Sequence, residues 1–380
     1  MRNKMKKSDI FWQTYLNLEK ELLEVSKYIY VTDENKSQLD IFSPHIADLI
    51  IRACIEIEAI SKELYFDFDG EKVRGDKNLF FDEDCLKLID IKCKTHKKVV
   101  MVTCPFFNLT KDENKFFRPL KEAHKRQGTD WEKAYQALKH DRYTSLDRGT
   151  VKNLIHAMGA LYLLNIYYRD IKLYTKFLEV SKLDLSLGSS IFSVKQPDQN
   201  NVARIINYED LTDILESGDS PFILKYTDSC YKQVLEANQK ERVELVGYLN
   251  DQPELKEPDF LQKLLAAIEL GKKDPSKQTN LLLEFCRYRL NKKIPSYLPF
   301  EERKQLFIRS PEWNGKIRQQ NNHLKEGELT EDNIQAEIDS AATLSAFEIQ
   351  QRFGKTKFFK AFNEGYCELV LDKGNVKYMK

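Results

Sequence analysis

The strongest constraint on the fold is the run from Val151 to Tyr168, in which most residues are apolar. A helix with apolar residues on nearly all sides must be covered by other helices. Thr150, directly before the run, is a good N-cap residue. The run is too short, and too polar at Asn165, to span a membrane. We therefore expect a buried central helix within a mainly α-helical fold.

A second capped helix precedes this central helix. Thr129 and Glu132 have the spacing of a capping box, which predicts that a helix begins after Gly128. Its apolar stripe recurs at helical spacing and consists of Trp131, Ala134, Tyr135 and Leu138. The stripe indicates that one face of this helix packs against the rest of a bundle.

Polar side chains gather where this second helix ends. Gln136 and His140 lie one turn apart, and the run Lys139-His140-Asp141-Arg142 leads into Tyr143. A polar loop then continues to Thr150. A titratable cluster at the mouth of a buried helix is the best candidate site in the chain.

Tryptophan, then tyrosine, then Lys-His-x-Arg ahead of a long apolar helix resembles one branch of the HEPN superfamily, the all-helical domains of prokaryotic defence and toxin systems. The resemblance covers roughly residues 8–195. In that branch the tyrosine is usually followed by Asn, where this chain has Gln136. The better-known signature of the superfamily, an Arg followed four to six residues later by a His, has a formal match at Arg118 and His124. Pro119 lies at a helix start there, and we interpret the match as incidental.

HEPN nucleases cleave RNA without a metal ion, the ribose 2′-hydroxyl attacking the neighbouring phosphate. The resemblance implies that His140 moves the proton and that Arg142 neutralises charge on the phosphorane oxygens. Residues two apart on a continuous helix point about 200° from each other, so both can face one substrate only if the helix ends at about His140. The candidate substrate-binding residues are Lys139, Gln136, Tyr143 and Arg126. HEPN-like bundles commonly pair across a two-fold axis, so we also expect a homodimer.

Two upstream helices are expected to complete the bundle. Apolar residues recur at helical spacing over residues 10–28, and Ser43 with Pro44 predicts the start of a second helix. Glu56 or Glu58 of that second helix could point at a site, but the alternative is that both are solvated, as carboxylates on a helix wall usually are. Residues 85–102 read as a third helix or as a helix followed by a short strand.

Composition limits the class of protein. The chain has 380 residues, of which 42% are hydrophobic, enough for the cores of two or three domains. Its formal net charge is +1, so a nucleic-acid contact must come from a local patch. The seven cysteines show no Cys-x-x-Cys pair and no His–Cys metal spacing. We therefore expect reduced thiols in a cytoplasmic protein, with no metal, no other cofactor, no signal peptide and no membrane partner.

The best local patch is the basic segment before the capped helix. It carries Phe116 and Phe117 among basic residues, which suits contacts to an RNA backbone together with base stacking. The alternative is a solvated helix face with the two rings packed on the bundle. The basic residues are Lys111, Lys115, Arg118, Lys121, Lys125 and Arg126.

The second half of the chain lies outside the HEPN resemblance. A helical pattern over residues 172–180 precedes it, and further helical patterns cover residues 208–216, 220–248, 259–270 and 278–290. The expected domains are a HEPN-like bundle over 1–195, a helical middle domain over 202–335 and a small module over 340–380. We find no Walker loop, dinucleotide fingerprint or His-Glu-x-x-His pair.

The expected C-terminal module resembles a winged helix-turn-helix. A helix over 346–353, a turn at Gly354, a helix over 355–363 and a hairpin over 366–379 carry the resemblance. Lys355, Lys357 and Lys360 would contact DNA phosphates. A protein-interaction module is the alternative.

Three functions remain open from the sequence. The first is an RNA-cleaving effector of a defence or toxin system. The second is a non-catalytic HEPN-like scaffold that binds a nucleotide or a partner protein. The third is a dimeric DNA-binding regulator that uses the C-terminal module.

Overall fold

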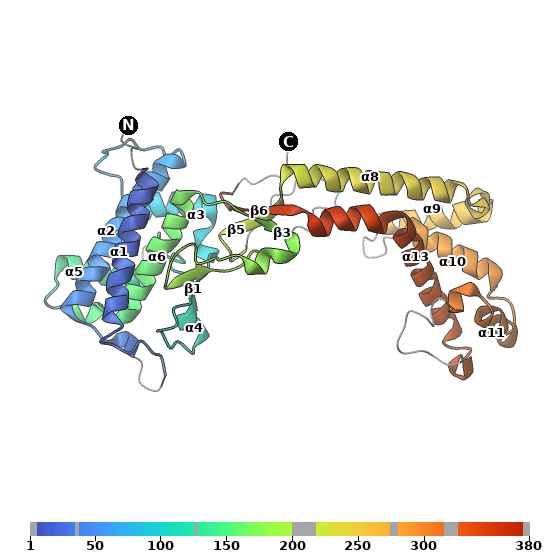
Figure 1. The fold of residues 1–380 in the computed structure, drawn as a ribbon, viewed down its shortest axis with the longest axis horizontal. Coiled ribbons are helices and arrows are strands. Elements are labelled where there is room, and N and C mark those ends of the chain that lie inside the picture. The colour runs from blue at the N-terminus through green and yellow to red at the C-terminus, as the bar shows by residue number, and fades with distance from the viewer. Residues whose placement is uncertain are drawn as a thin grey trace. The chain divides into compact units, whose positions relative to one another are not determined.

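The fold is mainly α-helical, as the apolar periodicity predicts (Figure 1). Contacts divide the chain into two compact units, Met1–Cys230 together with Gly365–Lys380, and Tyr231–Glu364. No helix in the described parts of the chain is both long and apolar enough to cross a membrane. The computed structural model describes residues 6–34, 38–125, 128–199, 218–273, 280–314 and 326–374.

The core of the first unit is a helical bundle around the predicted central helix. Every residue from Ala157 to Tyr167 is buried, which confirms a helix covered on nearly all sides. It contacts each of the other three helices of the bundle. These helices are α1 (Lys7–Val25), α2 (Pro44–Asp67), α5 (Asp130–His140) and the central α6 (Val151–Arg169).

The predicted helix starts are confirmed by their caps. The Ser43 hydroxyl accepts a hydrogen bond from the amide of Ile46 at the start of α2. Thr129 and Glu132 form the reciprocal capping box of α5. The Thr150 hydroxyl accepts from the amide of Asn153 at the start of α6. These local signals were sufficient because each involves residues within one turn of the other.

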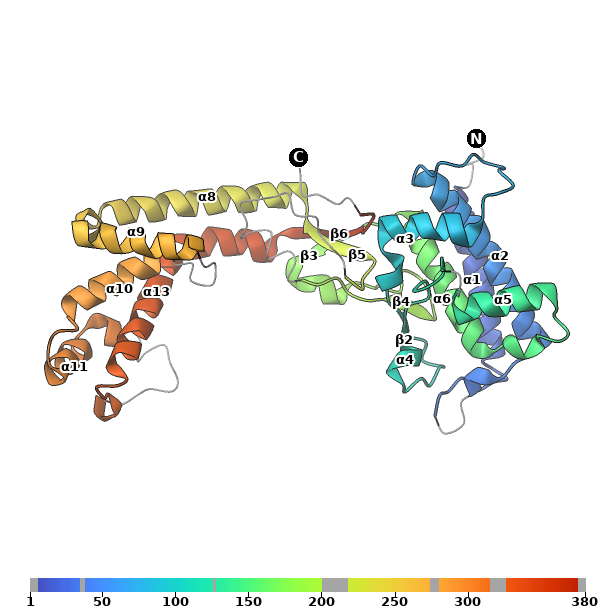
Figure 2. The same ribbon diagram turned by 180° about the vertical axis from the view of Figure 1, so that it is seen from behind.

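A small antiparallel sheet packs beside α6 (Figure 2). Its order is β2 (Phe116–Phe117), β1 (Val100–Val102), β4 (Phe192–Val194). Gly159 of α6 permits this approach, since a Cβ atom there would lie 2.6 Å from the Phe117 ring. The short helices α3 (Lys87–Cys93) and α4 (Asp112–Lys115) flank β1, so residues 85–102 contain a helix followed by a strand.

A second antiparallel sheet joins distant parts of the sequence. Its order is β3 (Leu173–Lys176), β6 (Tyr366–Leu371), β5 (Phe222–Tyr226). The helices predicted over 172–180 and from residue 220 are therefore wrong where β3 and β5 form. After β6, the carboxylate of Asp372 accepts a 3.0 Å hydrogen bond from the buried Lys98 ammonium group.

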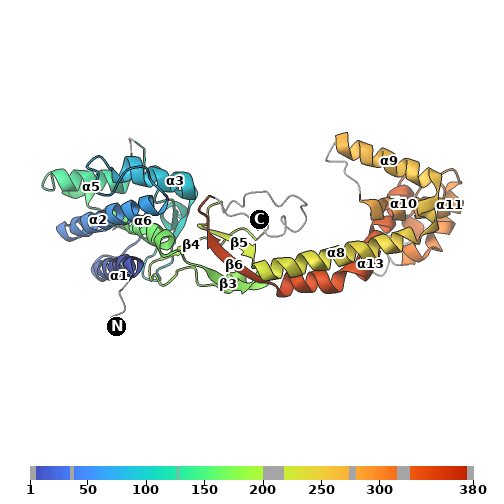
Figure 3. The ribbon, with the colours of Figure 1, turned by 90° about the horizontal axis from the view of Figure 1, so that it is seen from above.

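The second unit is an all-helical assembly with its own core. Phe260, Phe285, Phe307 and Ile334 are fully buried within it. The two longest helices of this unit, α8 and α13, lie side by side (Figure 3), and the centroids of the Tyr248 and Phe353 rings are 4.9 Å apart. The helices are α8 (Asp228–Asn250), α9 (Pro258–Lys273), α10 (Leu281–Lys293), α11 (Phe300–Ile308) and α13 (Ile334–Glu364).

The winged helix-turn-helix prediction is wrong. Helix α13 runs without interruption through Gly354, where a turn was expected. One glycine costs a helix only about 1 kcal/mol, less than the packing of its buried residues contributes. Strand β6, expected in a local hairpin, pairs with β3 and β5 instead. The second predicted strand of the hairpin, residues 375–379, lies outside the described residues.

The domain boundaries also differ from those expected. The division falls after Cys230 and Glu364, not near residues 196–201 and 335–340. The reason is the second sheet, because β5 and β6 pair with each other and β6 pairs with β3. The predicted helix over 208–216 lies outside the described residues.

Candidate functional site

Helix α5 ends at His140, the last residue before a sharp change of backbone direction. Asp141 leaves the helical conformation, with φ −148° and ψ 83°. Its carboxylate accepts hydrogen bonds from the amide of Thr144 at 3.2 Å and from the Thr144 hydroxyl at 2.5 Å. These bonds hold the turn that follows the helix. The geometric condition for His140 and Arg142 to face one substrate is therefore met.

Three predicted site residues project from this turn into solvent. His140, Arg142 and Tyr143 are all exposed, and Tyr143 is 95% exposed. Within the described parts of the chain, neither the His140 nor the Arg142 side chain has a hydrogen bond or an ion pair. An imidazole and a guanidinium group are thus both available to a ligand at the end of α5.

Lys139 contacts Glu58, a residue for which the sequence favoured a solvated position. Its ammonium group lies 3.9 Å from a carboxylate oxygen of Glu58 and 5.2 Å from the centroid of the Tyr135 ring. The Tyr135 hydroxyl donates a 2.8 Å hydrogen bond to the same Glu58 oxygen. Glu58 lies on α2 and was expected to be solvated. The structure instead makes Glu58 the residue that positions Tyr135 and Lys139, while Gln136 is half-buried nearby on α5.

The remaining predicted residues do not join this group. Arg126 lies outside the described residues. Lys355, Lys357 and Lys360 belong to α13 in the second unit, and Lys360 is exposed there. The side chains of Lys355 and Lys357 lie outside the described residues. The predicted DNA contacts of these three lysines depended on the recognition helix of a winged helix, and α13 is a continuous helix instead.

No family model, curated protein or solved structure matches this chain. The resemblance to the HEPN superfamily therefore stays a prediction. All seven cysteines are buried thiols outside any disulfide. Where the chain is described, no group of three or more His, Cys, Asp or Glu side chains is placed to hold a metal ion.

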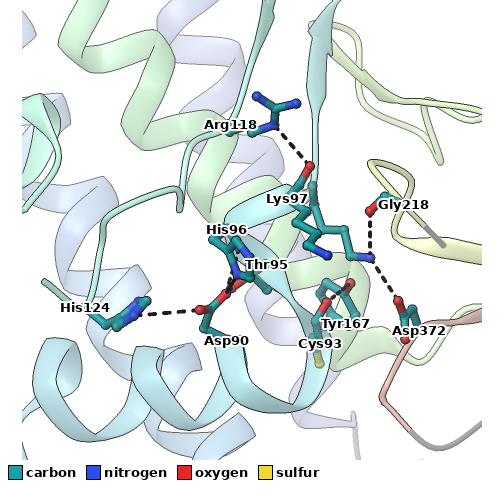
Figure 4. A network of polar contacts seen from close by, with 11 residues as sticks. Asp90, Cys93, Thr95, His96, Lys97, Arg118, His124, Tyr167, Gly218 and Asp372 are labelled. Carbon is teal, nitrogen blue, oxygen red and sulfur yellow. Dashed lines mark hydrogen bonds and ion pairs between the residues drawn. The ribbon is translucent and has the colours of Figure 1, made fainter. Parts of the chain in front are cut away.

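A second polar cluster, absent from the sequence predictions, surrounds Asp90 of α3. A left-handed backbone at Lys94, with φ +50°, ends α3 and turns the chain back. His96 then returns to Asp90, whose Oδ1 lies 2.8 Å from the His96 Nδ1 and accepts from the His96 amide at 2.7 Å. The other oxygen lies 3.7 Å from Nε2 of His124, so Asp90 stands between two imidazoles (Figure 4).

Arg118, the other half of the incidental Arg–His match, lies at the edge of this cluster. Its Nε donates a 3.3 Å hydrogen bond to the carbonyl of Lys97, and its terminal nitrogens point away from that contact (Figure 4). Residues 118–125 form turns and not a helix. The solvated helix face considered for the basic segment is therefore wrong at these residues, and the segment lines an open pocket beside His96.

Proposed function

We propose that the first unit is a HEPN-like endoribonuclease that cleaves RNA without a metal ion, as the cytoplasmic effector of a prokaryotic defence or toxin system. The observation that carries the proposal is the end of α5 at His140. On a continuous helix His140 and Arg142 would point in nearly opposite directions, and the end of the helix removes that constraint. Both side chains are exposed and without a side-chain partner where the chain is described.

The chemistry follows from the two groups. The His140 imidazole takes the proton from the ribose 2′-hydroxyl as its oxygen forms a bond to the neighbouring phosphorus. The Arg142 guanidinium group donates to the phosphorane oxygens, where negative charge develops. The bond to the 5′-oxygen then breaks, that oxygen takes a proton from water, and the His140 imidazolium returns its proton to the solvent. The products are a 2′,3′-cyclic phosphate and a 5′-hydroxyl end.

The supporting residues have the right character for a polyanionic substrate. Lys139 is partly exposed and contacts both Glu58 and the Tyr135 ring, which restricts where its ammonium group can lie. A restricted cation loses less conformational freedom when it binds a phosphate. Tyr143 offers an exposed ring on which a base can stack.

The test is cleavage of end-labelled RNA by the full-length protein in excess EDTA. His140→Ala and Arg142→Ala should each lower the cleavage rate at least about 100-fold, with unfolding free energy within about 1 kcal/mol of wild type because both positions are exposed. His45→Ala and Arg309→Ala, also at exposed positions, are the matched controls and should cleave normally. Product ends should carry a cyclic phosphate.

Two results would contradict the mechanism: loss of cleavage in EDTA, or cleavage that survives both substitutions. A large loss of stability in His140→Ala would identify a structural histidine instead. Inactivity of the wild-type protein under every activating condition would favour the non-catalytic scaffold.

We further propose that the first unit pairs as a homodimer. A two-fold axis beside the end of α5 would place two copies of His140 and Arg142 around one RNA strand. Light scattering on the full-length protein should give the mass of a dimer at micromolar concentration. A monomer at that concentration would leave each site to act alone and remove the shared-site arrangement.

A further inference from the structure

The basic segment lines an open pocket of about 810 Å³ in the first unit. The pocket is bordered by the turn that carries His96 and Lys97, by Arg118, Lys121 and Lys125, and by residues after β4 including Lys195. Ligand pockets in proteins are typically about 300–1,000 Å³. The volume therefore suits a small molecule with several polar groups.

Among the described residues, three of the cations at this pocket have no charge partner. In the described parts of the chain, no carboxylate lies within ion-pair distance of Lys97, Arg118 or Lys121. Lys195 is paired with Asp219, and Lys125 lies 3.8 Å from Glu122. Like charges held together without partners repel one another. An anionic ligand would relieve that repulsion.

An adjoining pocket of about 560 Å³ shares Arg118, Lys121 and Lys195 with the first and ends in aromatic groups. Phe116 is 37% exposed there, and the Phe117 ring stacks on the His156 imidazole at 4.4 Å. Burial lowers the pKa of His156 to about 4, so this end carries no imidazolium charge near neutral pH. The groove therefore runs from a cationic pocket that contains Lys97 to a pocket that contains the aromatic groups, and Arg118 and Lys121 line both.

We propose that this groove binds a nucleoside polyphosphate, with the phosphates against Lys97, Arg118 and Lys121 and the base beside Phe116 and His156. A polyphosphate places several anionic groups next to one another, as the gathered cations require. An RNA strand alternates phosphates and bases along its length, whereas here Lys97, Arg118 and Lys121 line one pocket and the rings of Phe116 and His156 line the adjoining one. The ligand class follows from this placement of cations and rings in two adjoining pockets.

The Asp90–His96 pair completes the phosphate end. Asp90 is only 13% exposed and engages Nδ1 of His96, which leaves Nε2 for a ligand in the pocket. The Thr95 hydroxyl donates a 3.0 Å hydrogen bond to the same Asp90 oxygen and fixes the carboxylate. His96 thus enters the pocket in a fixed orientation, and in its protonated form its Nε2 can donate to a phosphate oxygen.

The experiment is calorimetric titration of the full-length protein at low ionic strength with three probes: a ribonucleoside triphosphate, inorganic tripolyphosphate and the corresponding nucleoside. The triphosphate should bind at least about tenfold more tightly than either of the other two probes, because only it engages both ends of the groove. Arg118→Gln and Lys121→Gln should each weaken triphosphate binding by about tenfold or more, the loss expected for one charge-assisted hydrogen bond. Phe116→Ala should weaken the triphosphate and leave tripolyphosphate unchanged.

Lys133→Gln, at an exposed lysine of α5 away from both pockets, is the matched control and should bind as wild type. His140→Ala should also bind normally, so failure of the proposed cleavage and failure of this site are separate results. Equal affinity for tripolyphosphate and triphosphate would overturn the base contact. Binding unaffected by both Arg118→Gln and Lys121→Gln, or displacement of the triphosphate by lower concentrations of single-stranded RNA, would overturn the proposal.

Discussion

Glu132 is both a capping residue and a nearly buried carboxyl group. It accepts hydrogen bonds from the Thr129 amide at 2.7 Å and from the Thr129 hydroxyl at 2.9 Å. Burial nevertheless raises its pKa from 4.5 to about 7, because the loss of hydration outweighs those bonds. The side chain that caps α5 therefore has a pKa near neutrality, which the charge of Asp82 raises further and that of Lys133 lowers.

The stability of the first unit should fall as this group ionises. Because the folded pKa lies above the unfolded value, the contribution is fully present below pH 4.5 and is lost as the pH rises through about 7. Glu132→Gln keeps an acceptor oxygen and removes the titration. The wild-type melting temperature should therefore decline across this range relative to Glu132→Gln, by the equivalent of at most about 3 kcal/mol. Parallel melting curves for the two proteins across pH would contradict the shifted pKa.

Among the elements, α13 departs most from what its sequence predicts. Glycine at position 354 and the short helical patterns on both sides favour a turn, yet the helix continues to Glu364. Ala341 and Ala342 are fully buried in the core of the second unit, on the same helix. Packing of this kind stabilises a long helix that local preference alone would break.

Substitution of Gly354 distinguishes a continuous helix α13 from the helix-turn-helix expected from the sequence. In a continuous helix, Gly354→Ala should stabilise the protein by about 0.5–1 kcal/mol, because alanine loses less backbone freedom than glycine on folding. In the turn of a helix-turn-helix, alanine would be strained and would destabilise it. Chemical denaturation of the two full-length proteins distinguishes these results by sign. Ala342→Gly, in the buried part of α13, should destabilise and serves as the comparison.

In the whole molecule, the second unit is an insertion between two paired strands. Tyr226 of β5 is opposite Cys367 of β6, and the Thr227 amide donates a 3.0 Å hydrogen bond to the Tyr366 carbonyl. The chain therefore leaves and re-enters the first unit at neighbouring positions. A connection of a few residues could join the same two strands as a hairpin.

Replacing residues 231–364 with a short Gly/Ser linker should leave the first unit folded. The shortened protein should show helical circular dichroism and a cooperative thermal transition, since its bundle and both sheets remain. The control is a chain that ends at residue 230, which lacks β6, the central strand of its sheet. That control should be less stable because β3 and β5 lose their partner. Equal instability of both shortened proteins would contradict the independence of the first unit.

The site was predicted from sequence in part. The cap at Thr129 and the apolar stripe placed α5, whereas its end at His140 was stated only as a condition for His140 and Arg142 to face one substrate. The contact of Glu58 with Tyr135 and Lys139 could not be predicted, because it depends on how α2 packs against α5. The contact between Asp90 and His96 was not predicted for a similar reason, because the left-handed turn at Lys94 is needed to bring the two side chains together.

The sequence predicted the features that depend on residues one or two helical turns apart. These are the caps at Ser43, Thr129 and Thr150, and the buried helix that follows Thr150. The pairing of the strands in the second sheet could not be predicted from the sequence. Leu369 lies opposite both Leu173 and Leu224, and neither partner is near it in sequence. A strand is stabilised by the hydrogen bonds and side chains of its neighbours, which packing alone brings together. For that reason the order of residues specified the bundle, and long-range pairing determined where the first unit ends.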